Sequence, residues 1–107
     1  GTIANPPAAA CAEAARQLFR EARDKWNTEH ALGKDIYAFL AQRAKDMGYV
    51  LVGKIDGHRV ADFPHHKYCR QFMRTLEFSP AEALWIVEVQ IHDPAKQYGA
   101  FFEDILL

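Results

Sequence analysis

The sequence YVLVGKIDGHRVADF, residues 49–63, carries the clearest β-strand signal in this chain. Two apolar segments rich in β-branched residues lie on either side of the dipeptide Asp56-Gly57. Asp-Gly tolerates the positive φ angles that a two-residue turn requires, so its position between two such segments is typical of a β-hairpin. The sequence therefore predicts an antiparallel hairpin in which Ile55 pairs with His58 across the turn.

Two helices are predicted before this hairpin. From Ala8 to about Thr28 the apolar residues recur every three or four positions, which is typical of an amphipathic helix. Gly33 interrupts the pattern, Asp35 suits the N-cap of a second helix, and Gly48 lies where a left-handed C-terminal cap is expected. A short connection favours antiparallel packing of the two helices. The predicted buried stripe of the first helix comprises Cys11, Ala15, Leu18, Ala22 and Trp26.

The rest of the chain follows the predicted hairpin. A third helix is expected from Pro64 to about Leu76. In residues 85–92, apolar and more polar residues alternate as in a strand, and a continuing helix is the alternative. Asp93-Pro94 suits the start of a last helix. The predicted apolar stripe of that helix comprises Tyr98, Phe101, Phe102, Ile105 and Leu106. The predicted fold is therefore α+β, with the order ααββαβα and a small antiparallel sheet made of a hairpin and a third strand.

The composition is that of one folded domain. The chain has 107 residues, of which 50% are hydrophobic, 25% charged and 12% aromatic. This length leaves no core for a second domain, and the aromatic content argues against disorder. We expect residues 1–7 to form an extended leader and residues 8–107 to form the domain. No apolar segment reaches the roughly 20 residues that a membrane-spanning helix needs, so no membrane partner is expected.

Charge is sorted along the chain although its formal sum is −1. Residues 54–76 carry five basic and two acidic side chains, whereas residues 77–107 carry one basic and six acidic ones. Lys67, Arg70 and Arg74 share one face of the predicted third helix, and Arg59 lies on the strand before it. A solvated helix face has the same spacing. The alternative is a docking surface for an acidic protein or a second copy of the chain, and weak binding of nucleic acid is a further interpretation.

A cluster of histidine and cysteine is the most chemically suggestive feature. His65 and Cys69 lie four positions apart, so a helix would bring them together. With His92 supplied by the sheet, they form a candidate zinc site. Alternatively, Cys69 and His65 form a thiolate–imidazole pair. Cys69 also belongs to the apolar stripe of its helix, and a buried role as a small hydrophobe is the favoured interpretation.

Motifs for catalysis and for cofactor binding are missing from the sequence. It contains no phosphate-binding loop, dinucleotide fingerprint, His-Glu-x-x-His or Gly-x-Ser-x-Gly motif, and Ser79 is its only serine. The sequence therefore favours a non-enzymatic binding module without a cofactor, and zinc or thiol chemistry at His65 and Cys69 is the alternative. Two cysteines are too few for a disulfide scaffold, so we expect free thiols and favour a cytoplasmic location over an oxidising compartment.

Reversing the charges of Lys67, Arg70 and Arg74 tests the predicted docking surface. We expect weaker binding to a partner identified by affinity purification, with the largest loss at low salt, because screening shortens the range of exposed charges. The melting temperature should stay nearly unchanged, since these side chains are predicted to face away from the core. Titrations at several salt concentrations measure the effect, and an unchanged affinity would refute the surface.

Overall fold

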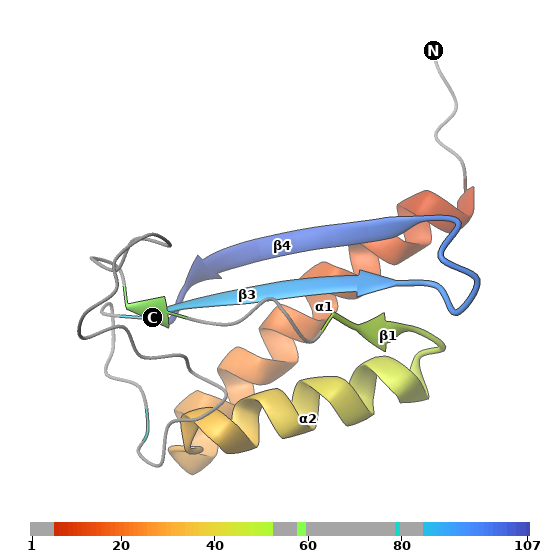
Figure 1. The fold of residues 1–107 in the computed structure, drawn as a ribbon. Helices are drawn as coiled ribbons and strands as arrows, with labels where there is room; N and C mark the ends of the chain where they lie inside the picture. The colour runs from red at the N-terminus through yellow and green to blue at the C-terminus, as the bar shows by residue number, and fades with distance from the viewer. Residues whose placement is uncertain (1–5, 53–57, 60–78, 80–84) are drawn as a thin grey trace, which may run out of the picture.

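The computed structural model describes residues 6–52, 58–59, 79 and 85–107 (Figure 1). Within these residues the helices are α1 (Pro6–Glu29) and α2 (Gly33–Asp46). The strands are β1 (Val50–Leu51), β2 (His58–Arg59), β3 (Trp85–His92) and β4 (Gly99–Ile105). The strands form one antiparallel sheet, and the helices pack against it, so the domain is α+β. Neither helix is long and apolar enough to cross a membrane among the residues searched.

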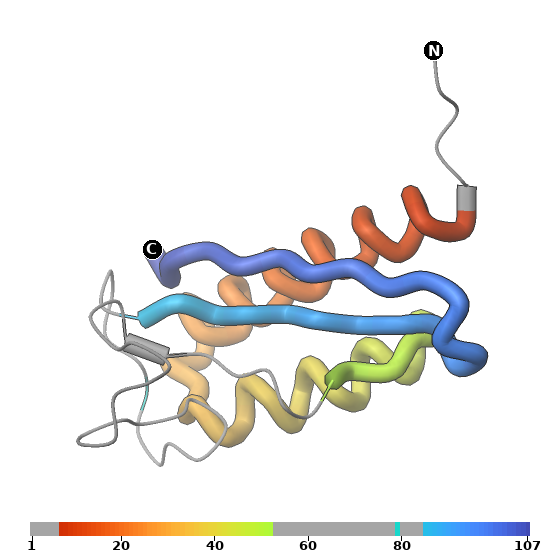
Figure 2. Tube along the Cα trace, turned by 45° about the horizontal axis from the view of Figure 1, so that its top comes forward, coloured from red at the N-terminus to blue at the C-terminus, as the bar shows by residue number. Residues whose placement is uncertain are grey.

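The amphipathic pattern of residues 8–28 correctly predicted α1, which begins two residues earlier, at Pro6. Proline is favoured in the first helical turn because its missing N–H has no partner there in any case. The predicted stripe is confirmed, since all five of its members are buried. Ala14 and Phe19 extend this buried face, which packs against β3 and β4 (Figure 2).

α2 runs back beside α1 after a short connection (Figure 1). The predicted N-cap is wrong: Leu32 occupies that position without a side-chain hydrogen bond, and Asp35 lies inside the first turn. An acidic side chain there still interacts favourably with the positive end of the helix dipole. The predicted C-terminal cap is confirmed, because Gly48 has a φ of 88° and Tyr49 N–H donates to the carbonyl oxygen of Ala44 at 2.8 Å.

An ion pair joins the two helices at their exposed margin. Arg43 Nε donates to the Glu21 carboxylate at 2.8 Å, and Gln17 donates to the same carboxylate at 2.9 Å. The hydrogen bond from Arg43 is the main reason that the pKa of Glu21 lies below its usual value. This contact adds a polar link between the two helices to their apolar packing.

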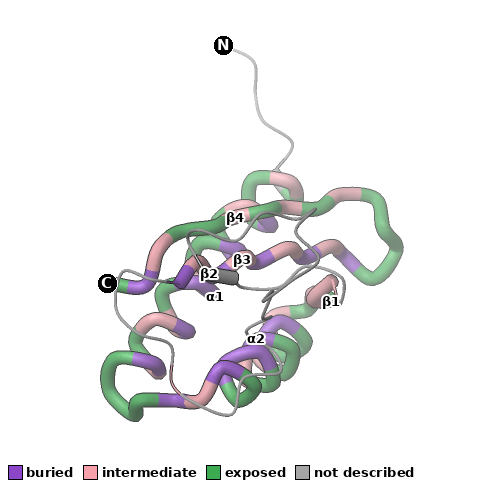
Figure 3. The backbone as a smooth tube through the Cα atoms, turned by 60° about the vertical axis from the view of Figure 1, so that its left-hand side comes forward, coloured by how far each residue is buried: buried purple, intermediate pink, exposed green. Residues whose placement is uncertain are grey.

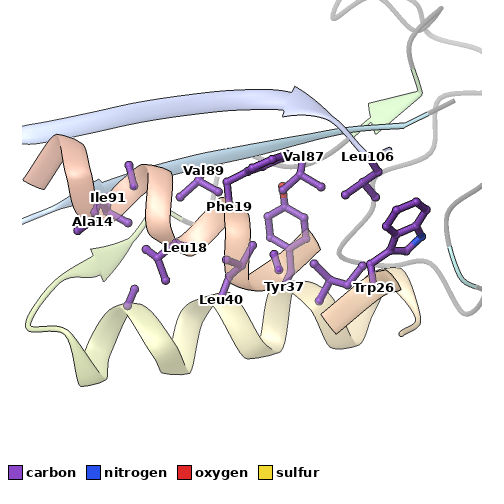
Figure 4. Close-up of a cluster of buried hydrophobic side chains, with 14 of the residues drawn as sticks. Ala14, Leu18, Phe19, Trp26, Tyr37, Leu40, Val87, Val89, Ile91 and Leu106 are labelled. Carbon is purple, nitrogen blue, oxygen red and sulfur yellow. The ribbon is translucent and has the colours of Figure 1, made fainter. Parts of the chain in front are cut away.

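The core lies between the helices and one face of β3. Burial alternates along this strand, with Trp85, Val87, Val89 and Ile91 buried and the residues between them half-buried (Figure 3). The buried row faces the apolar side chains of both helices (Figure 4). The strand predicted for residues 85–92 is therefore confirmed. The labelled side chains that surround this row in Figure 4 include Leu18, Phe19, Tyr37, Leu40 and Leu106.

The predicted hairpin around Asp56-Gly57 is wrong for the described strands. In β1, Val50 pairs with His92, and in β2, His58 pairs with Ile86, both antiparallel to β3 and along the same edge. β1 and β2 therefore run in the same direction and cannot be the two arms of an antiparallel hairpin. The long apolar strand β3 offers more pairing than a local turn does, and this tertiary context overrides the turn signal.

The predicted last helix is also wrong, because residues 99–105 form β4. The pairing runs without a break from Ile86–Ile105 to His92–Gly99. The apolar residues of this segment do not by themselves distinguish a strand from a helix: Ala100 and Phe102 pack against the core, while Phe101 and Glu103 are exposed. The adjacent edge of β3 decides between the two. A third helix at 64–76 would lie outside the described residues, and the predicted order ααββαβα is wrong.

The hydroxyl of Tyr37 in α2 bonds the backbone of β3. From Leu51 to His58 the chain advances seven positions, while the paired strand advances only five, from Ile91 to Ile86. Glu88 of β3 lies between the residues that pair with β1 and those that pair with β2. The buried Tyr37 hydroxyl donates to the carbonyl oxygen of Glu88 at 2.7 Å and accepts from its N–H at 3.2 Å. One side chain thus bonds both backbone groups of this residue.

Replacement of Tyr37 by phenylalanine tests this role. We expect the free energy of unfolding to fall by about 1–3 kcal/mol, the typical cost when a buried polar group loses its partner. Tyr98→Phe is the matched control, since no hydrogen bond of the Tyr98 hydroxyl occurs within the described part of the chain. Urea titration followed by circular dichroism measures both variants. Equal stability of Tyr37→Phe and the parent chain would contradict the bridging role.

Candidate functional site

The structure tests the sequence-predicted site residues only in part. His65, Lys67, Cys69, Arg70 and Arg74 lie outside the described residues. Arg59 is placed by its backbone in β2, where it pairs with Trp85. His92 ends β3. The proposed docking surface and the proposed zinc site therefore both remain predictions.

His92 is the one proposed zinc ligand whose surroundings are described. Its ring is half-buried, and Nδ1 lies 2.6 Å from the carbonyl oxygen of Asp93. A carbonyl oxygen only accepts, so Nδ1 carries the proton in this bond and Nε2 remains as the basic nitrogen. Among the residues searched, no three histidine, cysteine or acidic side chains are grouped to hold a metal.

The loop between β3 and β4 is held by a buried carboxylate. Asp93 is 6% exposed and accepts hydrogen bonds from the backbone N–H groups of Gln97 (2.6 Å), Tyr98 (2.9 Å) and Ala95 (3.1 Å). Burial alone would raise the pKa of Asp93, but these three donors outweigh it and hold the pKa below its usual value. Asp93 does act as a cap, as its sequence context suggested, but it caps a hairpin loop rather than a helix.

This loop places β4 as an edge strand. Tyr37 bonds the backbone of Glu88, and Val52 N–H donates to Gln90 at 2.8 Å, so even-numbered residues of β3 direct their backbone groups toward β1 and β2. The odd-numbered residues therefore bond β4, through its residues 100, 102 and 104. It follows that Phe101 and Glu103 direct their N–H and C=O groups away from β3. Within the described residues, β4 pairs with no other strand.

The accessible part of this edge is short and has two exposed side chains. Phe101 is 50% exposed and Glu103 is exposed, and both lie on the sheet face opposite the helices. Toward the end of the strand, Asp104 Oδ1 accepts the Ile105 N–H at 2.8 Å and so occupies that donor. We call the backbone and side chains of residues 99–103 the β4 edge. Beside it lies an open depression of about 440 Å³ whose lining includes His92, Gln97 and Phe101.

The β4 edge is acidic and rests on a fixed support. Glu103 lies directly opposite Glu88 of β3, on the same face of the sheet. Behind the strand, Phe102 packs on Phe19 of α1, with ring centroids 5.3 Å apart. Arg23 of α1 lies over the Phe19 ring, and no ion pair of Glu103 occurs in the described part of the chain.

Comparisons with protein families, with curated proteins and with solved structures found no match to this chain. The site is therefore interpreted from its geometry. Sequence reasoning missed the β4 edge because Phe101 was assigned to the buried stripe of a helix. The signal was Gly99: a Cβ there would lie 3.0 Å from the carbonyl oxygen of Ile91, a close approach of strands that favours glycine.

The carboxylate of Asp93 predicts a dependence of stability on pH. Its pKa in the folded state is below the value of about 3.9 typical of an unfolded chain, so the ionised group stabilises the fold at neutral pH. This contribution is lost as the pH falls through the pKa of the folded state. We expect Asp93→Asn to be less stable at pH 7, because an amide nitrogen cannot accept the N–H of Ala95. The difference from the parent chain should shrink in acid.

Urea unfolding between neutral and acidic pH measures this difference. Asp24→Asn is the control, since Asp24 is an exposed carboxylate on α1. A difference between Asp93→Asn and the parent chain that stays constant down to acidic pH would contradict the role assigned to Asp93.

Proposed function

We propose that this domain is a protein-interaction module that binds an extended segment of a partner chain as an additional strand beside β4. The observation that carries the proposal is the outward row of backbone groups at Phe101 and Glu103, on a strand that pairs on one side within the described residues. An exposed strand edge offers a partner main-chain hydrogen bonds, and the neighbouring side chains supply selectivity.

The shape of β4 supports this function. Protein edge strands are commonly protected from pairing by proline, lysine, bulges or inward-pointing charges. β4 contains neither proline nor lysine and keeps an uninterrupted register with β3 over seven residue pairs. Among the described residues, the bond from Ile105 N–H to Asp104 occupies a backbone donor at its far end. A strand with a continuous register is well suited to receive another strand.

The exposed aromatic ring supports the same interpretation. Phe101 is one of three large hydrophobic side chains described as exposed, together with Val50 and Leu107. Aromatic side chains contribute much of the binding energy at protein interfaces because they bury a large area with few rotatable bonds. The acidic side chain of Glu103 beside it does not favour a phosphate backbone, so the β4 edge supports a protein partner over nucleic acid.

The sequence-based docking surface remains a separate proposal. Lys67, Arg70, Arg74 and Arg59 would present cations to an acidic partner, whereas the β4 edge would present carboxylates and backbone groups. The two surfaces differ in charge and in type of contact. Charge reversal of the cations tests the first surface, and a proline substitution in β4 tests the second.

Glu103→Pro tests strand addition directly. Proline removes the outward N–H of this residue and places its ring where an added strand would lie, but breaks no bond to β3. We expect peptides selected from a random display library on the parent domain to bind Glu103→Pro about tenfold more weakly or worse, which corresponds to roughly one lost hydrogen bond.

Glu103→Thr is the matched control, because it removes the same side chain and keeps the backbone N–H. It should retain most of the binding, and all three proteins should show similar circular dichroism and melting temperatures. If the selected peptides bind Glu103→Pro as tightly as Glu103→Thr, strand addition at β4 is refuted. Failure to select any peptide with the parent domain would also count against the proposal.

A further inference from the structure

We infer that the strand added beside β4 is acidic on the side that faces α1, with aspartate or glutamate opposite Ala100 and Phe102. The groups that would meet these carboxylates are the guanidinium groups of Arg16, Arg20 and Arg23 on α1. This inference rests on the proposed function, which it deepens by naming the chemistry of the partner. Three features carry it: the position of α1 beside β4, the charge along that helix and the alternation of side chains in the added strand.

One flank of α1 lies beside β4. The other flank is occupied by α2, where Arg43 bonds Glu21. Phe19 lies on the flank away from α2, and its ring packs on Phe102 of β4. The helix and the strand run in the same direction, side by side (Figure 1 and Figure 2). A strand added beyond β4 would therefore extend along the flank of α1 that carries Phe19.

Three arginines line this flank. Arg16, Arg20 and Arg23 are spaced by four and three positions, so they share one face of the helix. The Cζ atom of Arg23 lies 5.9 Å from the centre of the Phe19 ring, so the ring that supports β4 also lies against an arginine. We call these three arginines the α1 arginine face.

The α1 arginine face carries more positive charge than the carboxylates beside it compensate. Glu13 bonds both Arg16 (3.1 Å) and Arg20 (2.9 Å), so one carboxylate serves two guanidinium groups. No ion pair of Arg23 occurs within the described residues. Asp104 points to the helix side of β4 and supplies a second carboxylate at the far end of the strand. Three cations against two carboxylates leave one positive charge.

The bonds to Glu13 leave Arg16 and Arg20 able to bind a partner. Both pairs are exposed, and exposed ion pairs contribute little to stability. A guanidinium group has five N–H donors in a planar fork, so one bond to Glu13 leaves donors for a further carboxylate. The α1 arginine face is thus suited to receive acidic side chains.

The alternation of side chains decides which partner residues reach these arginines. Phe101 and Glu103 are exposed on the outer face, so the partner residues opposite them turn their side chains to that face. The partner residues between them lie opposite Ala100 and Phe102, which pack on the helix side. Their side chains therefore turn toward α1. The expected pattern is acidic residues at alternating positions, whichever direction the added strand runs.

The same arginines argue against a second copy of the chain as the occupant. Two β4 strands paired about a twofold axis would bring the α1 helices of both copies side by side under the joined sheet. Arg16, Arg20 and Arg23 of one copy would then face the same arginines of the other, and like charges disfavour such an interface. A partner with carboxylates at these positions has the complementary charge.

Labelled peptides that differ in the placement of charge provide the test. The first peptide has two glutamates two positions apart in a strand of valine and threonine, the second has the same composition with the glutamates adjacent, and the third has lysine in place of both. Fluorescence polarisation measures their affinity. We expect the first peptide to bind the parent domain about threefold more tightly than the second, in which only one glutamate faces α1. We expect the third to bind about tenfold more weakly than the first, because like charges then meet.

Charge reversal on α1 gives the matching variant. Arg20→Glu turns the excess of one cation into an excess of one carboxylate, so it should bind the lysine peptide more tightly than the first peptide. Arg20→Gln should show little preference, and it remains informative if the reversal lowers the melting temperature. Lys45→Glu is the control, because it makes the same change of net charge at an exposed position of α2, on the other flank of α1.

The outcomes separate this inference from the proposed function. Equal binding of the three peptides that Glu103→Pro abolishes would overturn the acidic preference and leave strand addition standing. Equal losses in Arg20→Glu and Lys45→Glu would reveal a general effect of charge and would also overturn the preference. If Arg20→Glu weakens binding of the first peptide but Glu103→Pro does not, the peptide binds α1 alone and both proposals are wrong.

Sedimentation tests the remaining occupant. If no peptide binds but the domain sediments as a dimer that Glu103→Pro dissociates, the occupant is a second copy and the inference is wrong. If no peptide binds and the domain is a monomer, both proposals are wrong.

Discussion

The structure depends on one constraint: a buried central strand must satisfy the hydrogen-bonding groups on both of its edges. The apolar row of β3 packs against the helices, and its side chains Trp85, Val87, Val89 and Ile91 are buried. A backbone N–H or C=O left without a partner there would be costly. β4 satisfies one edge along its whole length, while β1, β2 and the hydroxyl of Tyr37 share the other. The elements around β3 are therefore arranged to complete its pairing.

The same constraint creates the candidate site. Each strand recruited to β3 carries a second row of backbone groups, and in β4 that row faces outward. The buried carboxylate of Asp93 fixes the loop, and the contact between Phe19 and Phe102 fixes the strand from behind. These contacts hold β4 in a defined position beside β3, and a preformed edge lowers the entropic cost of adding a further strand.

The comparison of prediction and structure separates local from remote determinants. Four features were predictable from short segments of sequence: α1, α2, the left-handed cap at Gly48 and the strand β3. The spacing of apolar residues indicates the helices, the glycine indicates the cap, and the alternation of apolar and polar residues indicates the strand. The predictions of a hairpin at Asp56-Gly57 and of a final helix were wrong, because β1, β2 and β4 all pair with β3. β1 and β2 are separated from β3 by many residues, so local patterns do not reveal this pairing. For the site, Phe101 was identified as apolar but assigned to a buried stripe, and Glu103 was not among the predicted site residues.

The sequence by itself determined which faces of the two helices are apolar, where these helices run and that residues 85–92 form a strand. These properties follow from the spacing of side chains along the chain, and they persist whatever the neighbours are. Only the tertiary structure decided that residues 99–105 extend and leave a polar edge exposed. Apolar side chains occur on both faces of β4, so their spacing does not by itself exclude a helix, and the choice depends on the open edge of β3 beside this segment.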